Sequence, residues 1–459
     1  MQSKKTFLSF ILFFGDVFLM YSSLFLTLAI RYHDFSFLPG PQTRIYLFNF
    51  SFIYLSWFLI LFIFDFYKVS FLKKSSDFFR NLIIFFFLAG AFGTIYFYLQ
   101  PQLSIAPKRI LFYDVLIFTI LFSFWRFVFN EITKLFNLRE KVAIIGYHQK
   151  FSELLTDSLK EGDYEISLFY NSDGKSFPYH KLAKFGFVKD PKKFKELIEK
   201  EGISTISFVP EFYKNEELVK EIFLNLPPKL NFINFVDLYE SFTKKIPLEV
   251  IDEPWFLENI YRVERKIDDI LKLGFDIFFS FIGFLIFIIF FPFIALAIKL
   301  DSEGPILFTQ KRMGKNRKIF TLYKFRTMKV DTNQEKELWR EKDPNQVTSV
   351  GKILRKFYLD ELPQFFNILK GDISFVGPRP EWVALAKIFE KEISFYSFRY
   401  IVKPGLIGWA QLNFPASGST REAKEKFQYD LYYIKNRSFW LDSIILFKAV
   451  KLFFIPPKQ

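Results

Sequence analysis

The sequence contains no cysteine and only three histidines, His33, His148 and His180, in 459 residues. The missing thiols exclude disulfide bridges, thiolate metal sites and cysteine nucleophiles. Since no histidine follows His180, chemistry in the C-terminal half must use carboxylates, hydroxyls, lysine, arginine or a carboxylate-bound metal.

Hydrophobic residues make up 51% of the chain, including 68 phenylalanines, which is too apolar for a purely soluble protein. The formal net charge of +14 favours an anionic partner, which could be lipid headgroups, a phosphorylated substrate or nucleic acid. The long apolar segments decide in favour of a membrane. We therefore expect a membrane protein that contacts the lipid bilayer and does not bind nucleic acid.

Residues 1–136 carry four apolar segments, each long enough to cross ~30 Å of hydrocarbon. They lie at residues 6–30, 46–66, 81–99 and 110–132. They predict a four-helix transmembrane bundle, and the surrounding basic residues place both of its chain ends in the cytoplasm. The first segment is too long for a cleaved signal peptide, so we expect it to be retained. For Asp16, Asp114 and Arg126 within these segments, interhelical pairing or placement near the membrane interface is the favoured interpretation, and a lipid or substrate path is the alternative.

Between residues 141 and 245, short apolar runs alternate with amphipathic helical patterns at about 151–160, 194–201 and from Glu216, which is typical of a parallel α/β domain. The glycine-rich loop of a dinucleotide site is missing, because Gly146 is followed by Tyr-His-Gln. We interpret this region as a degenerate Rossmann-like domain with a structural or regulatory role, and nucleotide sensing is the alternative. Residues 246–270 are predicted to form a linker.

The C-terminal part, residues 300–459, begins with a strongly basic stretch. Residues 311–329 contain eight lysines and arginines and no acidic residue. Gly314 is predicted to turn a hairpin, and on its second arm Lys324 and Arg326 alternate with aromatic residues. Because alternate residues share one face of a strand, the two charges could meet a diphosphate together.

A second stretch, residues 360–380, opens on the adjacent carboxylates Asp360 and Glu361. Asp360 is predicted to cap a helix over residues 362–370, which Gly371 ends. The start of a helix stabilises an ionised carboxylate or a bound phosphate. An acidic pair alone is ordinary capping, so this pair gains meaning only from the motifs around it.

Together with residues 403–411 and 429–436, these stretches resemble the bacterial sugar transferase family, whose phosphoglycosyl transferases start glycan assembly on a polyprenyl phosphate. The resemblance extends from Lys272 to the C-terminus, and several motifs in the same order make it specific. It implies transfer of a sugar phosphate from a nucleotide diphosphate sugar, usually a UDP-sugar, to undecaprenyl phosphate, with release of UMP. Such a step starts the assembly of an exopolysaccharide or another membrane glycan.

The resemblance also implies residue roles. Asp360 would be the nucleophile that forms an acyl phosphate with the sugar phosphate, and Glu361 would position a metal or handle a proton. Asp360 and Glu361 would bind a Mg²⁺ ion, which reduces the repulsion between two anionic reactants. The implied phosphate-binding residues are Arg312, Lys324, Arg326, Arg355 and Arg379. The implied donor-pocket residues are Gly405, Gly408 and Gln411.

Residues 271–299 are long and apolar enough for a transmembrane helix, but Pro292 interrupts them. A full crossing would separate the basic motifs from nucleotide sugars in the cytoplasm. We therefore expect a re-entrant membrane helix that breaks at Pro292 and returns to the cytoplasmic face, followed by an α+β catalytic domain. The resemblance implies the same arrangement, in a multi-pass protein of the bacterial inner membrane with its catalytic domain in the cytoplasm.

Two other functions stay open. A membrane glycosyltransferase would form a glycosidic bond and release UDP, but the D-x-D metal motif expected for it is missing from the sequence. A non-catalytic membrane sensor of nucleotide sugars would be built around the Rossmann-like domain. The identity of the sugar is open, and so is the oligomeric state, for which a homo-oligomer is one alternative.

Overall fold

The computed structural model describes residues 2–32, 41–67, 75–100, 107–135, 140–146, 164–170, 186–188, 190–210, 216–227, 230–261, 266–329, 346–414 and 419–454. The chain divides into two compact units. The first contains residues 1–140, and the second contains most of residues 141–453.

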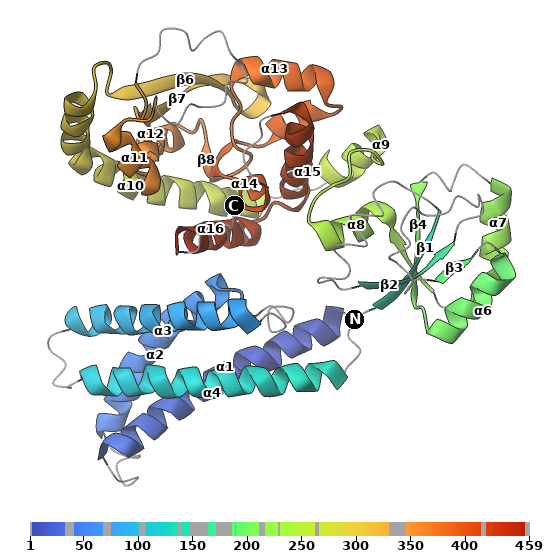
Figure 1. Cartoon of the computed structure of the whole chain (residues 1–459), viewed down its shortest axis with the longest axis horizontal. Helices are drawn as coiled ribbons and strands as arrows, with labels where there is room; N and C mark the ends of the chain where they lie inside the picture. Colours follow the sequence, from blue (N-terminus) through green and yellow to red (C-terminus); the bar gives the residue numbers. More distant parts are fainter. Residues whose placement is uncertain are drawn as a thin grey trace. The chain divides into compact units, whose positions relative to one another are not determined.

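Four long helices make up the first unit (Figure 1). They are α1 (Gln2–Tyr32), α2 (Pro41–Ile63), α3 (Ser75–Tyr98) and α4 (Pro107–Leu135). Each contains a segment long and apolar enough to cross a membrane, and apolar side chains such as Phe18 and Phe87 are exposed on their outer faces. The prediction of four apolar helices in residues 1–136 is confirmed.

Polar side chains within these helices point at one another. Arg126 Nη2 donates a hydrogen bond to Asp16 Oδ2 at 2.6 Å, and both side chains are buried. Asp114 accepts hydrogen bonds from Ser23 Oγ at 2.6 Å and from the Tyr54 hydroxyl at 2.9 Å. Of the two favoured interpretations, interhelical pairing thus holds for Asp16 and Arg126, while Asp114 is satisfied by hydroxyls of α1 and α2, as buried polar groups in hydrocarbon require.

The middle of the chain forms a five-stranded sheet in the order β3-β2-β1-β4-β5. The strands are β1 (Glu140–Ile145), β2 (Tyr164–Tyr170), β3 (Gly186–Val188), β4 (Thr205–Phe208) and β5 (Asn231–Asn234). β1 pairs with β4, β4 with β5 and β2 with β3, each in parallel, and α6 (Pro191–Glu201) and α7 (Glu216–Asn225) belong to the same region (Figure 1). The predicted parallel α/β domain is confirmed. The helix predicted near residues 151–160 lies outside the described residues.

The segment after β5 joins the core of the C-terminal domain. α8 (Phe235–Thr243) lies against α15 (Thr420–Asn436), where Lys435 donates to Asp237 at 2.8 Å and to Glu240 at 2.6 Å. The stretch predicted as a linker also packs into that core. Its buried side chains in the shared hydrophobic cluster are Ile246, Leu248, Ile251, Trp255 and Phe256.

The C-terminal domain combines small sheets with helices. β6 (Leu307–Met313) and β7 (Ile319–Phe325) form the predicted antiparallel hairpin, with Gly314 at the start of its turn. β8 (Ser374–Val376) pairs in parallel with β9 (Gly405–Ile407). The helices are α11 (Ser349–Lys356), α12 (Gln364–Leu369), α13 (Val383–Glu392), α14 (Trp409–Asn413), α15 and α16 (Phe439–Phe454).

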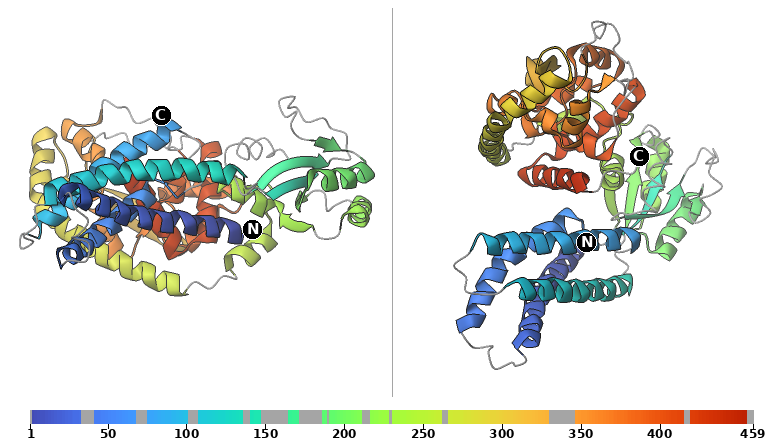
Figure 2. Two further views of the ribbon diagram at one scale, coloured as in Figure 1. Left: turned by 90° about the horizontal axis from the view of Figure 1, so that it is seen from below. Right: turned by 60° about the vertical axis from the view of Figure 1, so that its left-hand side comes forward.

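The helix α10 (Lys266–Asp301) precedes this domain and contains Pro292. Figures 1 and 2 show that α10 changes direction within its length, as expected where a proline removes a backbone hydrogen bond. Many of its apolar side chains are exposed, among them Phe278 and Phe293. The helix therefore needs a lipid or protein environment around it, since an exposed surface this apolar is unfavourable in water.

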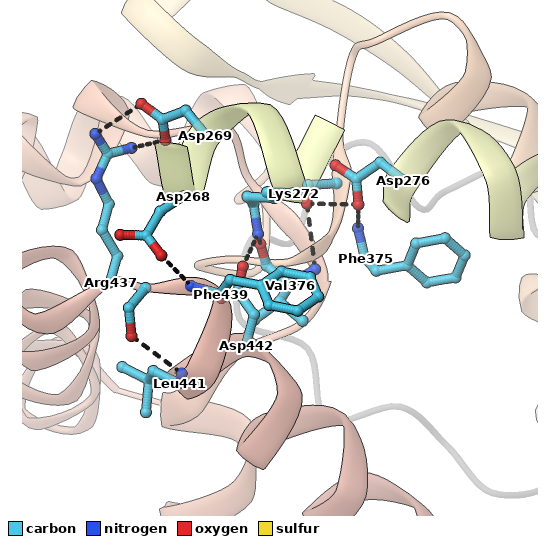
Figure 3. A network of polar contacts seen from close by, with 12 residues as sticks. Asp268, Asp269, Lys272, Asp276, Phe375, Val376, Arg437, Phe439, Leu441 and Asp442 are labelled. Carbon is cyan, nitrogen blue, oxygen red and sulfur yellow. Dashed lines mark hydrogen bonds and ion pairs between the residues drawn. The ribbon is translucent and has the colours of Figure 1, made fainter. Parts of the chain in front are cut away.

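Polar contacts hold the start of α10 against the C-terminal domain (Figure 3). Lys272 Nζ donates to the Val376 carbonyl at 2.8 Å and to Asp442 Oδ2 at 2.5 Å. Asp276 Oδ1 accepts from Ser374 Oγ at 3.0 Å and from the backbone N–H of Phe375 at 3.1 Å. These two charged residues thus connect α10 to β8 and α16.

The end of α10 is held by the same domain. Asp301 Oδ2 accepts from the Val350 N–H at 2.9 Å, at the start of α11. The Arg326 guanidinium donates to the Ser302 carbonyl at 2.7 Å and also to the Glu303 carbonyl. Both ends of α10 are therefore attached to one domain, on either side of the bend.

Candidate active site

Asp360 and Glu361 lie in η7 (Leu359–Glu361), a short 3-10 helix between α11 and α12. Tyr358 precedes it in the left-handed conformation, with φ +57°, and α12 begins only at Gln364. The prediction that Asp360 caps a helix starting at residue 362 is therefore wrong, because the left-handed residue and the 3-10 turn occupy the positions that local capping would use. Gly371, with φ +80°, follows the end of α12 as predicted.

Two cations hold the carboxylate of Glu361. Lys324 Nζ donates to Glu361 Oε1 at 2.6 Å, and Arg379 Nη2 donates to the same oxygen at 2.9 Å. Burial alone would raise the pKa of Glu361, but Arg379 and Lys324 outweigh it and lower the pKa to about 2. Glu361 is therefore ionised at any physiological pH.

The carboxylate of Asp360 is less constrained. Among the described residues, no side chain donates a hydrogen bond to it. Burial raises the pKa of Asp360, while the charges of Lys324 and Arg355 oppose this effect. The backbone N–H of Asp360 itself donates a hydrogen bond to this carboxylate. A partly desolvated, ionised carboxylate with so few donors is more nucleophilic than a fully solvated one, because fewer of its lone pairs are engaged.

The other predicted phosphate ligands have different partners. Arg355 Nε donates to Thr327 Oγ1 at 2.9 Å. Arg312 donates to the Pro380 carbonyl at 2.9 Å, and burial lowers its pKa to about 10, which leaves it charged at neutral pH. Arg326 is buried against the carbonyls after α10. Lys324 and Arg326 thus have separate partners, and the structure brings only Lys324 and Arg379 directly to the carboxylate pair.

Comparison with known proteins places these residues within a part of the chain that matches a protein family. The family model described as bacterial sugar transferase matches residues 267–455. An exopolysaccharide production protein, PSS, of Rhizobium leguminosarum bv. phaseoli is 39% identical over 189 residues, which are 40% of this chain and 94% of that protein. The chain belongs to the bacterial sugar transferase family.

Two further relatives of the chain have names that state an activity. The UDP-N-acetylgalactosamine-undecaprenyl-phosphate N-acetylgalactosaminephosphotransferase of Aeromonas hydrophila is 43% identical over 181 residues, which are 39% of this chain and 43% of that protein. The UDP-glucose:undecaprenyl-phosphate glucose-1-phosphate transferase of Klebsiella pneumoniae is 40% identical over 210 residues, 45% of this chain and 42% of that protein. The chain thus spans less than half of the length of these two relatives.

The glycines predicted to shape a donor pocket make close backbone contacts in this sugar transferase domain. A Cβ atom on Gly405 would lie 2.0 Å from the Gly377 nitrogen, and one on Gly408 would lie 2.7 Å from the Gly377 carbonyl oxygen. Gln411 Oε1 accepts from the Gly408 N–H at 2.7 Å. These three residues therefore bring the chain from β9 to α14 against the turn that carries Arg379, and a role in a donor pocket stays a prediction.

The carboxylate pair suits a divalent cation that also takes ligands from a substrate. Mg²⁺ is usually held in proteins by one or two carboxylates together with waters and substrate phosphates. Asp360 and the oxygen of Glu361 that faces neither Lys324 nor Arg379 offer such ligands. In the described part of the chain, no group of three or more acidic or histidine residues could hold a metal without a substrate.

A buried charge cluster behind the turn was not singled out by any sequence pattern. Arg399 Nε donates to Asp430 Oδ2 at 2.6 Å, and Arg399 Nη1 lies 3.4 Å from Glu381 Oε1. Lys426 Nζ also donates to Glu381 Oε1, at 3.0 Å. The one signal in the sequence is that Arg399 is the sole charge within an aromatic run, FYSFRYI. Such a residue needs buried partners.

Proposed function

We propose that this chain transfers a sugar phosphate from a UDP-sugar to undecaprenyl phosphate and releases UMP, as the first step in assembling an exopolysaccharide or another membrane glycan. Membership of the sugar transferase family and the names of the two relatives support this reaction class. The observation that carries the proposal is the contrast between the two adjacent carboxylates. Glu361 is held by two cations, whereas no side chain among the described residues donates to Asp360.

In the proposed reaction, an ionised oxygen of Asp360 attacks the phosphorus next to the sugar. The bond from that phosphorus to the oxygen bridging to UMP breaks, and the electron pair leaves with UMP. The product is an acyl phosphate between Asp360 and the sugar phosphate. An oxygen of undecaprenyl phosphate then attacks the same phosphorus, which returns the carboxylate and forms the lipid diphosphate sugar. Dividing the displacement into two steps allows each anionic reactant to enter separately.

The cations around the pair determine its charge. Lys324 and Arg379 keep Glu361 ionised, and with Arg355 they reduce the repulsion between Asp360 and the donor diphosphate. Asp360 and Glu361 would hold Mg²⁺, which supplies further neutralisation of phosphate charge when bound. Arg355 and Arg379 are also suited to bidentate contacts with phosphate oxygens.

The attachment of α10 supports a re-entrant topology. A straight helix of 36 residues would be about 54 Å long, and a complete crossing would place its ends on opposite sides of the membrane. Contacts at Lys272, Asp276 and Asp301 tie both ends to one domain. We therefore place both ends on the cytoplasmic face of the bacterial inner membrane, with the four N-terminal helices crossing it.

The decisive experiment measures UMP release from a panel of UDP-sugars in membranes that contain undecaprenyl phosphate. UMP release that depends on donor and lipid, and that is lost in Asp360→Asn, is expected. Asp237→Asn, an exposed carboxylate on α8, serves as the matched control and should retain activity. Release of UDP would overturn the proposal in favour of glycosidic transfer. Absence of turnover with every donor would favour a sensor.

The acyl phosphate has its own test. Incubation of the full-length protein with donor but without lipid acceptor should increase the mass of the peptide containing Asp360 by one sugar phosphate. Subsequent addition of undecaprenyl phosphate should remove that mass. A native protein that turns over but never carries the added mass would contradict the two-step path.

The absence of cysteine allows a direct test of the α10 topology. Single cysteines at Lys266 and Glu303, both exposed in the structure, can be labelled with a membrane-impermeant maleimide in intact cells and in inverted vesicles. We expect both positions to be labelled only in inverted vesicles. Labelling of the two positions from opposite sides would refute the re-entrant topology.

A further inference from the structure

The turn that carries Arg379 contains two prolines and is held mainly through its carbonyl groups. Pro378 and Pro380 have no backbone N–H, so they cannot donate hydrogen bonds. The Pro378 carbonyl accepts from the Gly405 N–H at 3.0 Å. The next two carbonyls accept from arginine side chains: Arg379 O from the buried Arg399 through Nη2 at 2.7 Å, and Pro380 O from the half-buried Arg312 through Nη1 at 2.9 Å. The position of the Arg379 backbone therefore depends on Arg399.

Arg399 is itself fixed on three sides. Its side chain is 3% exposed, and its Nε atom donates to Asp430 Oδ2 at 2.6 Å. Its Nη1 atom lies 3.4 Å from Glu381 Oε1 and donates to the Tyr396 hydroxyl at 3.3 Å. Its Nη2 atom donates to the Arg379 carbonyl. One rigid guanidinium plane thus connects α15, η8 (Tyr396–Ile401) and the turn at residues 378–380. Lysine could not reproduce this, because its ammonium group has no planar arrangement of donors.

A buried charge cluster of this kind is a weak source of stability. Removing charges from water costs free energy that their mutual attraction often only offsets, and well-packed apolar residues can replace such pairs without loss. What ion pairs with defined geometry do supply is a fixed position for the groups they contact. In this domain the contacted group is the backbone carbonyl of Arg379. The side chain of the same residue donates a hydrogen bond to Glu361 Oε1 at 2.9 Å.

We propose that Arg399, oriented by Asp430, is a positioning residue for the sugar-phosphate transfer: it holds the Arg379 carbonyl so that the Arg379 guanidinium stays on Glu361 beside Asp360. This inference rests on the proposed function. Arg399 reaches the carboxylate pair only through Arg379, so the effect of losing it must pass through that residue. A displacement of catalytic groups by about 1 Å can lower the rate on the order of 100-fold.

The test measures kcat and the donor KM for UMP release by the full-length protein carrying Arg399→Lys, Arg379→Lys or both changes. Arg399→Lys is expected to lower kcat on the order of 100-fold with little change in the donor KM. Asp430→Asn, which keeps the shape and one acceptor oxygen, should cause a smaller loss of kcat. The control Arg437→Lys changes an arginine that pairs with Asp269 of α10 at 3.2 Å, and it should keep normal kcat.

The double variant distinguishes positioning from a general structural role. If Arg399 acts through Arg379, the double variant loses no more activity than Arg379→Lys alone, whereas multiplied losses would overturn the proposal. Normal kcat in Arg399→Lys would also overturn it. If Arg399→Lys does not fold, Asp430→Asn replaces it: the activity of Asp430→Asn combined with Arg379→Lys is then compared with that of Arg379→Lys alone. Absence of UMP release by the unaltered protein would refute the proposed function, and the positioning role with it.

Discussion

Lys324 offers a test of how the charges around the carboxylate pair work. Its ammonium group lies 2.6 Å from Glu361 Oε1, and its charge lowers the pKa of both Asp360 and Glu361. Replacement by methionine keeps the length of the side chain and removes the charge. We expect Lys324→Met to raise the pKa values of both carboxyl groups. Burial raises each pKa, and the positive charge of Lys324 that counteracts this effect is then missing.

The magnitude follows from the charge environment. An opposite charge at this separation lowers the pKa of a carboxyl group by about 1 to 3. Without Lys324, the pKa of Glu361 should rise from about 2 toward its ordinary value of 4.5, and that of Asp360 should rise further above 3.8. A rise of about 2 corresponds to about 3 kcal/mol less preference for the ionised form.

The assay is the pH profile of kcat/KM for UMP release. Asp360 must be ionised to attack, so activity is present above its pKa and is lost as the pH falls through it. Because Lys324→Met raises that pKa, the acid limb should move to higher pH by about 1 unit. Lys311→Met is the matched control, since Lys311 lies on the same hairpin and is exposed, with Thr321 Oγ1 at 2.9 Å.

The opposite result would be informative. If Lys324→Met raised the donor KM and left the acid limb in place, Lys324 would act on the donor phosphates and not through the two carboxylates. The charge argument for Asp360 and Glu361 would then be refuted.

Three other changes test the domain around the pair. Gly405→Ala should prevent a stable catalytic domain, because its Cβ would lie 2.0 Å from the Gly377 nitrogen, whereas Gly274→Ala, with no atom within 4 Å, should keep the normal melting temperature. Asn367→Leu removes hydrogen bonds to the Thr321 carbonyl and from the Tyr323 N–H, and should cost about 2 kcal/mol; an unchanged melting temperature would contradict this. Chelation of divalent cations should stop UMP release and added Mg²⁺ should restore it, and release that persists in the chelator would contradict the proposed metal.

Much of the architecture could be predicted from local patterns in the sequence. Four apolar helices follow from the length of apolar runs alone, and parallel strands follow from short apolar runs that alternate with amphipathic helices. The hairpin over residues 307–325 and the stop at Gly371 follow from single glycines where the chain must turn. The pairing of Asp16 with Arg126 was predictable because hydrocarbon leaves an isolated charge no other partner.

The partners of the basic residues were decided only by the tertiary structure. Strand alternation suggested that Lys324 and Arg326 act together, but Arg326 follows the last residue of β7 and its buried guanidinium bonds to the carbonyls after α10. Local capping rules placed Asp360 at a helix start, but the left-handed Tyr358 leads into a 3-10 turn instead. The partner of Arg326 depends on a segment that is distant in the sequence. The turn at Asp360 depends on a backbone conformation that the pattern of apolar and polar residues does not reveal.

The sequence by itself thus determined that the protein has membrane helices, a parallel α/β domain and a carboxylate pair among basic motifs. Only the tertiary structure decided which cations meet which carboxylates. It brought Arg399 to Asp430 across 31 positions and to the carbonyl of Arg379 across 20. The physical reason is that a buried charge takes whichever partner the folded chain places within hydrogen-bond distance, and that distance is set by packing between elements, not by spacing along the chain.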